Sequence, residues 1–225
     1  DQDSLKKEAN ALRAFQNYSA IKVLAEGDGF LLLQRAIPGQ SLRILFPDLD
    51  SKALKITANL IGQLHRAAYS SDDFTHLRDW LEPLRCTWDI PEGFLSLANS
   101  LATDLLHSSK SQVLLHADLH HDNILQNGAE WVVIDPKGVI GDPVYEVAAF
   151  IRNPIDCLIN TADLESILLE RSTAFAKLLN FERTRILQWS FVQAVLSWVW
   201  AIEDDTDITY FEKLTHTLDR VLQKD

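Results

Sequence analysis

Two stretches of the sequence decide the fold: His116-Ala117-Asp118-Leu119-His120-His121-Asp122-Asn123 and Ile134-Asp135-Pro136-Lys137-Gly138. Short apolar or β-branched runs flank them and predict strands at 113–115, 124–126 and 131–134. Asn127-Gly128 lies between the last two runs and is the strongest short-range hairpin signal, because both residues can adopt positive φ. We therefore expect the side chains of Asp118, Asn123 and Asp135 to converge on one rim of a small hairpin.

These three side chains suit phosphoryl transfer. An Asp can accept the proton of a substrate hydroxyl, while an Asn and a second Asp supply oxygen ligands for a Mg²⁺ that bridges nucleotide phosphates. The spacing His-x-Asp-x-x-x-x-Asn is that of the catalytic loop of protein kinases, and Asp135 falls where their metal-binding Asp lies. The two motifs together predict Asp118 as the catalytic residue, with His116 supporting the loop, and Asn123 and Asp135 as metal ligands.

The sequence resembles the aminoglycoside phosphotransferase family over nearly its whole length. The residues from Ile134 to Pro154, and also Ala201-Ile202-Glu203-Asp204, are most similar to its streptomycin and hydroxyurea resistance branch. The resemblance implies an α+β, protein-kinase-like fold, with a mainly helical catalytic and substrate-binding lobe at 37–225 and a remnant of the N-terminal nucleotide-binding lobe at 1–36. It also implies an enzyme that uses ATP or GTP with Mg²⁺ to phosphorylate a hydroxyl of an aminoglycoside such as streptomycin.

The resemblance also suggests a nucleotide site. Asp3 to Gln16 reads as a helix, in which Glu8 matches the kinase glutamate that pairs with a strand lysine. Two predicted strands, 20–24 and 30–34, lead to a hinge at which the backbone of Gln34, Arg35 and Ala36 would bind adenine. Lys137, beside the metal-binding Asp, would contact phosphate or substrate, although an exposed loop lysine is an equal alternative. In the family the Gly-rich loop and strand lysine lie upstream of these elements, so we expect the 225 residues alone to bind nucleotide poorly.

Acidic residues supply the candidate substrate contacts. Glu203-Asp204-Asp205-Thr206-Asp207 follows an apolar helix predicted at 183–202, where carboxylates oppose the helix macrodipole, so a compensating gain is expected. The resemblance favours Glu203 and Asp204 as partners of protonated amino or guanidino groups, and leaves Asp207 as a helix cap. Asp142-Pro143 reads as an N-cap with Pro at N1 that opens a helix to Arg152. This role explains Asp142 completely, so a substrate contact is the less favoured interpretation.

Composition narrows the class of protein. A hydrophobic content of 47% in 225 residues allows a sizeable core, and a net charge of −11 argues against nucleic acid or anionic membrane as partners. The charge is compatible with a small cationic, hydroxylated substrate. Cys86 and Cys157 lie far apart without metal-ligand spacing, which is typical of buried thiols in a reducing cytoplasm. No signal or membrane span is evident, and we expect a monomer or weak dimer.

Three alternatives remain open at this point. A kinase of the same fold could act on choline, homoserine, methylthioribose or a fructosamine, because fold does not fix substrate. The crowding of His and Asp between 116 and 122 could instead mark a metal-dependent hydrolase. A non-catalytic pseudokinase is suggested by the lack of a recognisable strand lysine, although Asp118, Asn123 and Asp135 are all retained.

Overall fold

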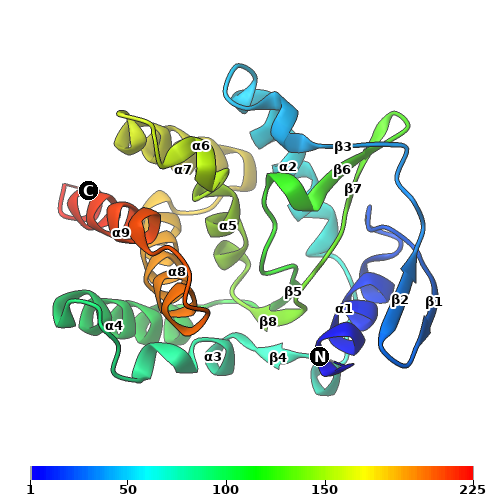
Figure 1. Cartoon of the computed structure of the whole chain (residues 1–225), viewed down its shortest axis with the longest axis horizontal. Helices are drawn as coiled ribbons and strands as arrows, with labels where there is room; N and C mark the ends of the chain where they lie inside the picture. The colour runs from blue at the N-terminus through cyan, green and yellow to red at the C-terminus, as the bar shows by residue number, and fades with distance from the viewer. Residues whose placement is uncertain (1, 225) are drawn as a thin grey trace.

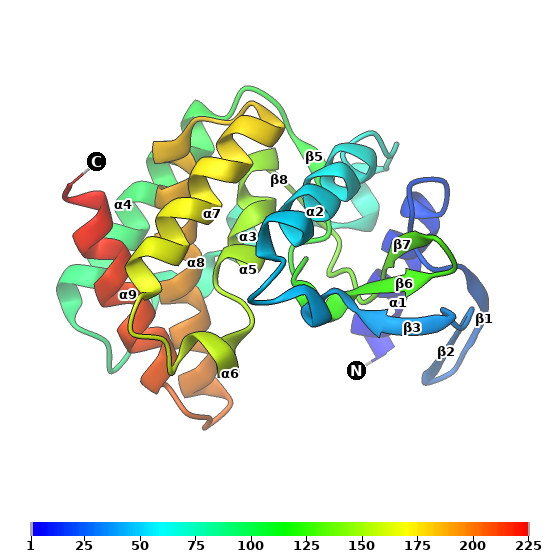
Figure 2. The same ribbon diagram turned by 90° about the horizontal axis from the view of Figure 1, so that it is seen from above.

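The computed structural model describes residues 2–224. A helical part lies beside a smaller part, which is rich in strands and carries the N-terminus (Figure 1 and Figure 2). The helices are α1 (Gln2–Phe15), α2 (Asp50–Leu64), α3 (Leu77–Trp80), α4 (Glu92–Ser108), α5 (Val147–Ile151), α6 (Ile155–Leu158), α7 (Leu164–Leu179), α8 (Arg183–Glu203) and α9 (Thr209–Leu222). The strands are β1 (Val23–Gly27), β2 (Phe30–Leu33), β3 (Pro38–Ser41), β4 (Thr75–His76), β5 (Val113–Leu115), β6 (Ile124–Asn127), β7 (Glu130–Val133) and β8 (Val139–Gly141).

The predicted hairpin forms as β6 and β7, whose antiparallel pairing runs in register from the pair Ile124 and Val133 to the turn. Gly128 in that turn has a φ of +63°, as the sequence signal requires. Strand β3 pairs with the outer edge of β6, and Ala20 forms a parallel bridge with Val133 on the edge of β7. Both edges of the hairpin are therefore covered, which restricts its register.

A second sheet, in the order β4-β8-β5, contains a strand that the sequence did not reveal. From the sequence, the glycines at 138 and 141 predict a compact loop, but Val139–Gly141 pairs antiparallel with β5 and parallel with β4. Val139 and Ile140 are completely or almost completely buried. Burial of these two side chains favours a strand over a loop, and Gly138, at a φ of +65°, allows the chain to turn into it.

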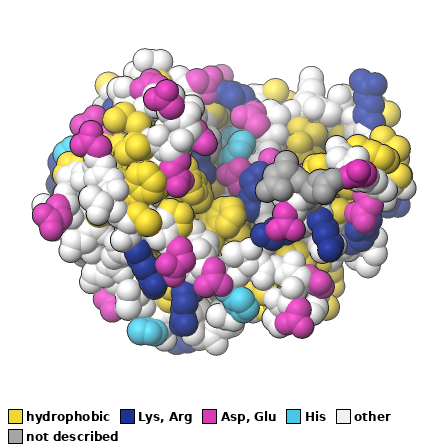
Figure 3. All heavy atoms as spheres, turned by 60° about the horizontal axis from the view of Figure 1, so that its bottom comes forward, with side chains coloured by type: hydrophobic (Ala, Val, Ile, Leu, Met, Phe, Trp, Pro, Cys, Tyr) yellow, Lys and Arg dark blue, Asp and Glu magenta, His cyan; other side chains and the backbone are white. Residues whose placement is uncertain are grey.

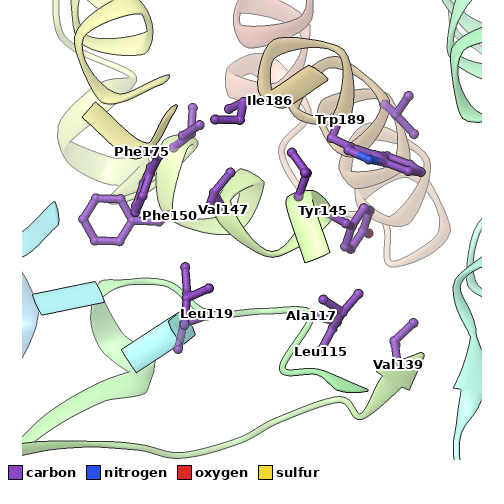
Figure 4. Close-up of a cluster of buried hydrophobic side chains, with 14 of the residues drawn as sticks. Leu115, Ala117, Leu119, Val139, Tyr145, Val147, Phe150, Phe175, Ile186 and Trp189 are labelled. Atoms are coloured by element: carbon purple, nitrogen blue, oxygen red, sulfur yellow. The ribbon is translucent and has the colours of Figure 1, made fainter. Parts of the chain in front are cut away.

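Helix α8 is the centre of the helical part and lies among α4, α5, α7 and α9 (Figure 2). Its side chains from Ile186 to Val199 are almost all buried, as its uninterrupted apolar character predicts. Figure 4 shows how this core continues to the 115–119 segment, where Leu115, Ala117 and Leu119 face α5, with α7 and α8 beyond it. Burial of the apolar side chains of Leu115, Ala117 and Leu119 thus holds the segment that follows β5 against the helical core.

Three smaller expectations need correction. The apolar periodicity from 51 to 69 predicts one helix, but α2 ends at Leu64. The strand expected at 20–24 begins only at Val23, after the isolated bridge at Ala20. Cys86 and Cys157 are both exposed rather than buried; Cys86 follows a short turn of helix at 82–85, and Cys157 lies in the four-residue helix α6. Within residues 2–224, no helix combines the length and the apolar character that crossing a bilayer would require.

Candidate active site

A buried glutamate fixes the loop between β5 and β6. Glu146, only 1% exposed, accepts hydrogen bonds from the backbone N–H groups of His116, at 2.8 Å, and Ala117, at 2.9 Å. His65 Nε2 lies 3.4 Å from the same carboxylate. Burial raises the pKa of Glu146, but the interactions with His65 and His116 outweigh it and the net pKa is lowered, so the carboxylate is ionised. Ala117 is thereby held at a φ of +67°, in the left-handed region that residues with a Cβ rarely adopt.

Glu146 contacts the loop and His65 contacts Glu146, but neither was among the candidate site residues. From the sequence, Glu146 falls within the helix expected after Pro143, and His65, beside the apolar face of a predicted helix, reads as a packing or capping residue. The carboxylate lies thirty residues downstream of the amide it binds at His116, and such a contact leaves no local pattern. The His116 to Asn123 motif shows the loop, but not the group that holds it.

His116 connects the two motifs. Its Nε2 lies 2.8 Å from the carbonyl oxygen of Ile134, and its own carbonyl accepts the N–H of Lys137 at 2.8 Å. Burial lowers the pKa of His116, so the ring is neutral. We assign the proton to Nε2, because that nitrogen faces a carbonyl, while Nδ1 faces the N–H of Asp118 at 3.4 Å. His116 is a bridge between the loop and the segment that carries Asp135.

Hydrogen bonds hold together the segments that carry the three predicted oxygen-bearing side chains. Asn123 Nδ2 donates to the carbonyl oxygen of Asp118 at 2.9 Å, and the Asn123 carbonyl accepts the N–H of Ile134 at 3.0 Å. Asp135 follows directly, with a φ of +56°, and its carboxylate bonds Lys137 Nζ at 2.8 Å. The amide oxygen of Asn123 and the carboxylate of Asp135 are hard donors of the kind that Mg²⁺ prefers, so this pair fits a magnesium ion.

The Asp118 carboxylate lies in a positive environment that sequence reasoning did not anticipate. Arg152 donates to Asp118 Oδ1 at 3.2 Å, and His120 Nε2 lies 3.7 Å from Oδ2. Burial raises the pKa of Asp118, but positive charge beside it, chiefly that of Arg152, outweighs burial and lowers it. Burial also lowers the pKa of His120 to about 4. At neutral pH Asp118 is therefore an ionised acceptor beside a neutral histidine.

Glu8 and Asp135, one of the two predicted metal ligands, line one small cavity. The cavity has a volume of about 180 Å³ and is lined by α1 residues, Trp80 and the segment from Asp135 to Lys137. Burial raises the pKa of Glu8, the charge of Asp135 raises it further, and Lys137 partly offsets both. The structure thus brings Glu8, Asp135 and Lys137 into one electrostatic group.

The expected hinge connects β2 to β3. The N–H of Gln34 already donates to the carbonyl of Lys22 at 2.8 Å, because the chain there continues the pairing of the β1–β2 hairpin. This amide is therefore occupied within the protein and does not contribute to the expected adenine contact. The prediction of an adenine contact then depends on the Gln34 carbonyl, the exposed Arg35 and the buried backbone of Ala36.

The acidic turn lies at the end of α8. Glu203 is its last residue, Asp204 is its C-cap, and both are exposed. One turn earlier, Trp200 packs edge to face on Trp80, with 5.4 Å between ring centroids, and Trp80 also lines the Glu8 cavity. Asp207, expected as the cap of the last helix, lies one residue before the N-cap Ile208, and its Oδ1 accepts the N–H of Thr209, the first residue of α9, at 2.9 Å. Figure 3 shows the lower face of the view in Figure 1, where acidic and basic side chains are interspersed around an apolar area.

Asp142 does not join the other candidate substrate residues. It is 3% exposed, and its Oδ1 accepts the N–H of Val144 at 3.0 Å, which confirms the predicted N-cap. Its Oδ2 accepts from Arg185 Nε at 2.8 Å and from Trp189 Nε1 at 2.9 Å. With both oxygens engaged inside the protein, the geometry does not support a contact between Asp142 and substrate.

The histidines of the 116–122 segment do not make a hydrolase centre. His121 is fully buried and stacks on Phe150, with ring centroids 4.0 Å apart, while His116 binds a backbone carbonyl. Across residues 2–224, no group of three or more His, Cys, Asp or Glu side chains is arranged to hold a metal ion. The hydrolase alternative therefore has no ligand set in the described part of the chain.

Comparisons with known proteins agree with this geometry. A sequence profile of the family described as aminoglycoside/hydroxyurea antibiotic resistance kinase matches residues 1–205. The chain is 31% identical over 190 residues to the streptomycin 3″-kinase of Klebsiella pneumoniae, a match that covers 82% of this chain and 71% of that protein. It is 24% identical over 206 residues to a streptomycin 6-kinase of Streptomyces griseus, covering 86% of this chain and 66% of that protein.

Solved structures confirm the protein-kinase-like fold. A thermostable mutant of aminoglycoside phosphotransferase APH(4)-Ia, in a ternary complex with ADP and hygromycin B, superposes with a TM-score of 0.71 at 15% identity, covering 98% of this chain and 82% of that one. Choline kinase LicA from Streptococcus pneumoniae also gives 0.71, at 13% identity, covering 100% and 84%. At these identities the likeness establishes the fold alone, and the family assignment comes from the sequence. The chain belongs to the aminoglycoside/hydroxyurea antibiotic resistance kinase family.

Proposed function

We propose that this protein transfers the γ-phosphoryl group of ATP or GTP to a hydroxyl of a cationic small molecule, with an aminoglycoside such as streptomycin as the acceptor. The observation that carries the proposal is the hydrogen bond from the Asn123 amide to the Asp118 backbone, together with the links through His116 and Ile134 that hold Asp135 beside them. This arrangement supplies a proton acceptor and two oxygen ligands from adjoining turns, as phosphoryl transfer requires.

In the proposed reaction the acceptor oxygen forms a bond to the γ-phosphorus while the bond from that phosphorus to the β–γ bridging oxygen breaks. The carboxylate of Asp118 orients the hydroxyl and receives its proton. The lowered pKa of Asp118 makes it a weak base, which suits a loose transition state in which the proton leaves late. His116 keeps the loop in place, and Asn123 and Asp135 would hold a Mg²⁺ ion, which would neutralise negative charge on the phosphates.

The nucleotide would lie between the two parts of the chain. Residues 1–36 form the nucleotide side in this proposal, with the backbone from Gln34 to Ala36 at the adenine and Glu8 facing Lys137 near the phosphates. The ion pair between Lys137 and Asp135, at 2.8 Å, keeps a positive charge where the phosphates would come. Residues 37–225 form the catalytic and acceptor side.

The acceptor is assigned from charge and from the family. Glu203 and Asp204 are exposed carboxylates at the end of α8, and they would bind protonated amino or guanidino groups. The net charge of −11 favours a cation over an anion. Choline-type acceptors carry a cation too, so only a direct comparison separates them from aminoglycosides.

The test is a phosphotransfer assay on the full-length protein with Mg²⁺ and either ATP or GTP. The acceptor panel contains streptomycin, hydroxyurea, choline and homoserine, and the product is identified by mass. We expect transfer to streptomycin, and its loss in Asp118→Ala with nucleotide affinity near that of the wild type. Turnover retained by Asp118→Ala would refute the catalytic assignment. Transfer only to choline or homoserine would move the protein to a metabolite kinase, and no transfer at all would favour a pseudokinase.

A further inference from the structure

Arg152 is the buried cation beside the proposed base. It is the C-cap of α5, its side chain is 13% exposed, and its guanidinium contacts two side chains. One terminal nitrogen donates to Asp118 Oδ1 at 3.2 Å, and Nε donates to Gln193 Oε1 at 3.1 Å. The Arg152 carbonyl accepts the hydroxyl of Tyr210 at 2.6 Å. Side chains from α8 and α9 therefore fix this arginine in one place.

The two residues that bind Arg152 from α8 and α9 are buried. Gln193 is 1% exposed in the middle of α8, and Tyr210 is 2% exposed on α9. Arginine presents its donors in a fixed planar fork, so a guanidinium held at Nε also holds its terminal nitrogens in direction. Burying a guanidinium is costly unless its hydrogen bonds are satisfied, and these contacts satisfy part of that requirement.

The contact with Arg152 makes the two oxygens of Asp118 unequal. Oδ1 is engaged by the guanidinium, whereas the nearest imidazole nitrogen, that of His120, is 3.7 Å from Oδ2 and too distant for a hydrogen bond. We propose that Arg152 is a positioning residue for the transfer reaction, an inference that rests on the function proposed above. Arg152 fixes Asp118 Oδ1, and Oδ2 is thereby presented to the acceptor hydroxyl. The α8 and α9 helices thereby align the base with an acceptor bound at the end of α8.

The sharpest control for Arg152 is Arg185. Its side chain is 17% exposed and forms the buried ion pair with Asp142, so its removal also breaks a buried arginine–aspartate pair. Its other partners are Ser108 and the Leu105 carbonyl. A loss of stability alone would affect the two arginines alike, whereas a loss of alignment at Asp118 would affect only one.

The kinetic test compares Arg152→Met, Arg152→Lys and Arg185→Met in the full-length protein. A displacement of about 1 Å at a reacting group can cost about 100-fold, so we expect Arg152→Met to lower kcat by about that factor, with the KM for nucleotide within about twofold of the wild type. Lysine keeps the charge without the fork and should recover part of the rate. Arg185→Met should keep kcat within about threefold after correction for the folded fraction. An equal fall in kcat for both methionine variants, or a raised nucleotide KM with unchanged kcat for Arg152→Met, would overturn the proposal.

A second experiment measures stability and does not depend on turnover. Free energies of unfolding in urea are measured for the wild type, Asp118→Asn, Arg152→Met and the double variant, and a cycle of these four values isolates the interaction of the two side chains. We expect the double variant to lose less stability than the two single losses added together. Additive losses would show that Arg152 does not fix Asp118 and would overturn the inference even if phosphotransfer were absent. Coupled side chains in a protein that transfers no phosphoryl group would instead locate the failure in the proposed function.

Discussion

The Glu146 carboxylate offers the clearest test of how the catalytic loop is held. Glu146→Gln changes one atom and keeps the size of the side chain. The carboxylate accepts from two backbone N–H groups, those of His116 and Ala117. A glutamine has a single carbonyl oxygen, so its amide nitrogen would face a second N–H donor. One of the two backbone donors then stays buried without a partner.

The magnitude follows from these contacts. A hydrogen bond to a charged group contributes about 1.5–3 kcal/mol, and an unsatisfied buried donor costs about 1–3 kcal/mol. Relief of the desolvated charge offsets part of this loss, so we expect Glu146→Gln to lower the free energy of unfolding by about 3 kcal/mol. The loop residue Ala117 would relax from its positive φ. Because Asp118 follows directly, a shift of about 1 Å should lower kcat by about 100-fold.

Urea unfolding and steady-state phosphotransfer measure the two effects in the same preparation. The matched control is Glu165→Gln, because Glu165 is 34% exposed and pairs with Lys224 at 2.8 Å on the surface. Such a pair contributes at most about 1 kcal/mol, and kcat should not change. If Glu146→Gln behaves like Glu165→Gln in both assays, the carboxylate does not hold the loop and the reasoning is refuted.

Two further predictions concern stability. Burial raises the pKa of Asp50, but its ionic and hydrogen-bonded partners, including Arg171, outweigh it, and the pKa lies below the ordinary 3.8. The stabilisation from this ion is therefore present above about pH 4 and lost as the pH falls through the folded-state pKa. Asp50→Asn should lower the unfolding free energy at pH 7, and its difference from the wild type should shrink below pH 4; urea titrations showing a constant difference across the acid range would contradict this. Gly138→Ala should lower Tm, because φ is +65° and the new Cβ would lie 2.9 Å from the Phe74 ring, at a cost of about 1–2 kcal/mol. Gly62→Ala, in open space within α2, should raise Tm slightly by helix propensity, and a fall in Tm shared by both alanines would argue against a specific strain at 138.

Local chemistry explains what the sequence could predict. Asn127-Gly128 encodes its own turn, and the apolar runs beside it encode the strands that pair. The spacing from His116 to Asn123 lies within one loop, so its geometry follows from few residues. Asp142 before Pro143 is a cap that needs only its neighbours, and the structure confirms it. The apolar character of α8 predicted its central place for the same reason.

Contacts between distant segments explain what the sequence could not predict. Arg152 reaches Asp118 across 34 positions, and Gln193 anchors it across a further 41. No periodicity or spacing connects such residues before the helices pack. Strand β8 was missed because its three residues are too short to show alternation, and it pairs with strands far earlier in the chain. The exposed acids at 203 and 204 show the opposite case, since burial and contacts alone do not reveal what they bind.

The covered hairpin has a consequence for motion. β6 and β7 lie between β3 and the Ala20 bridge, and the bond from Ile134 to Asn123 continues their ladder beyond the last strand residues. Asp135 follows this bonded pair directly, so the ladder of the hairpin ties the backbone at Asn123 to the backbone that carries Asp135. We therefore expect the spacing between these two proposed ion ligands to be preserved if the N-terminal strands shift relative to α8.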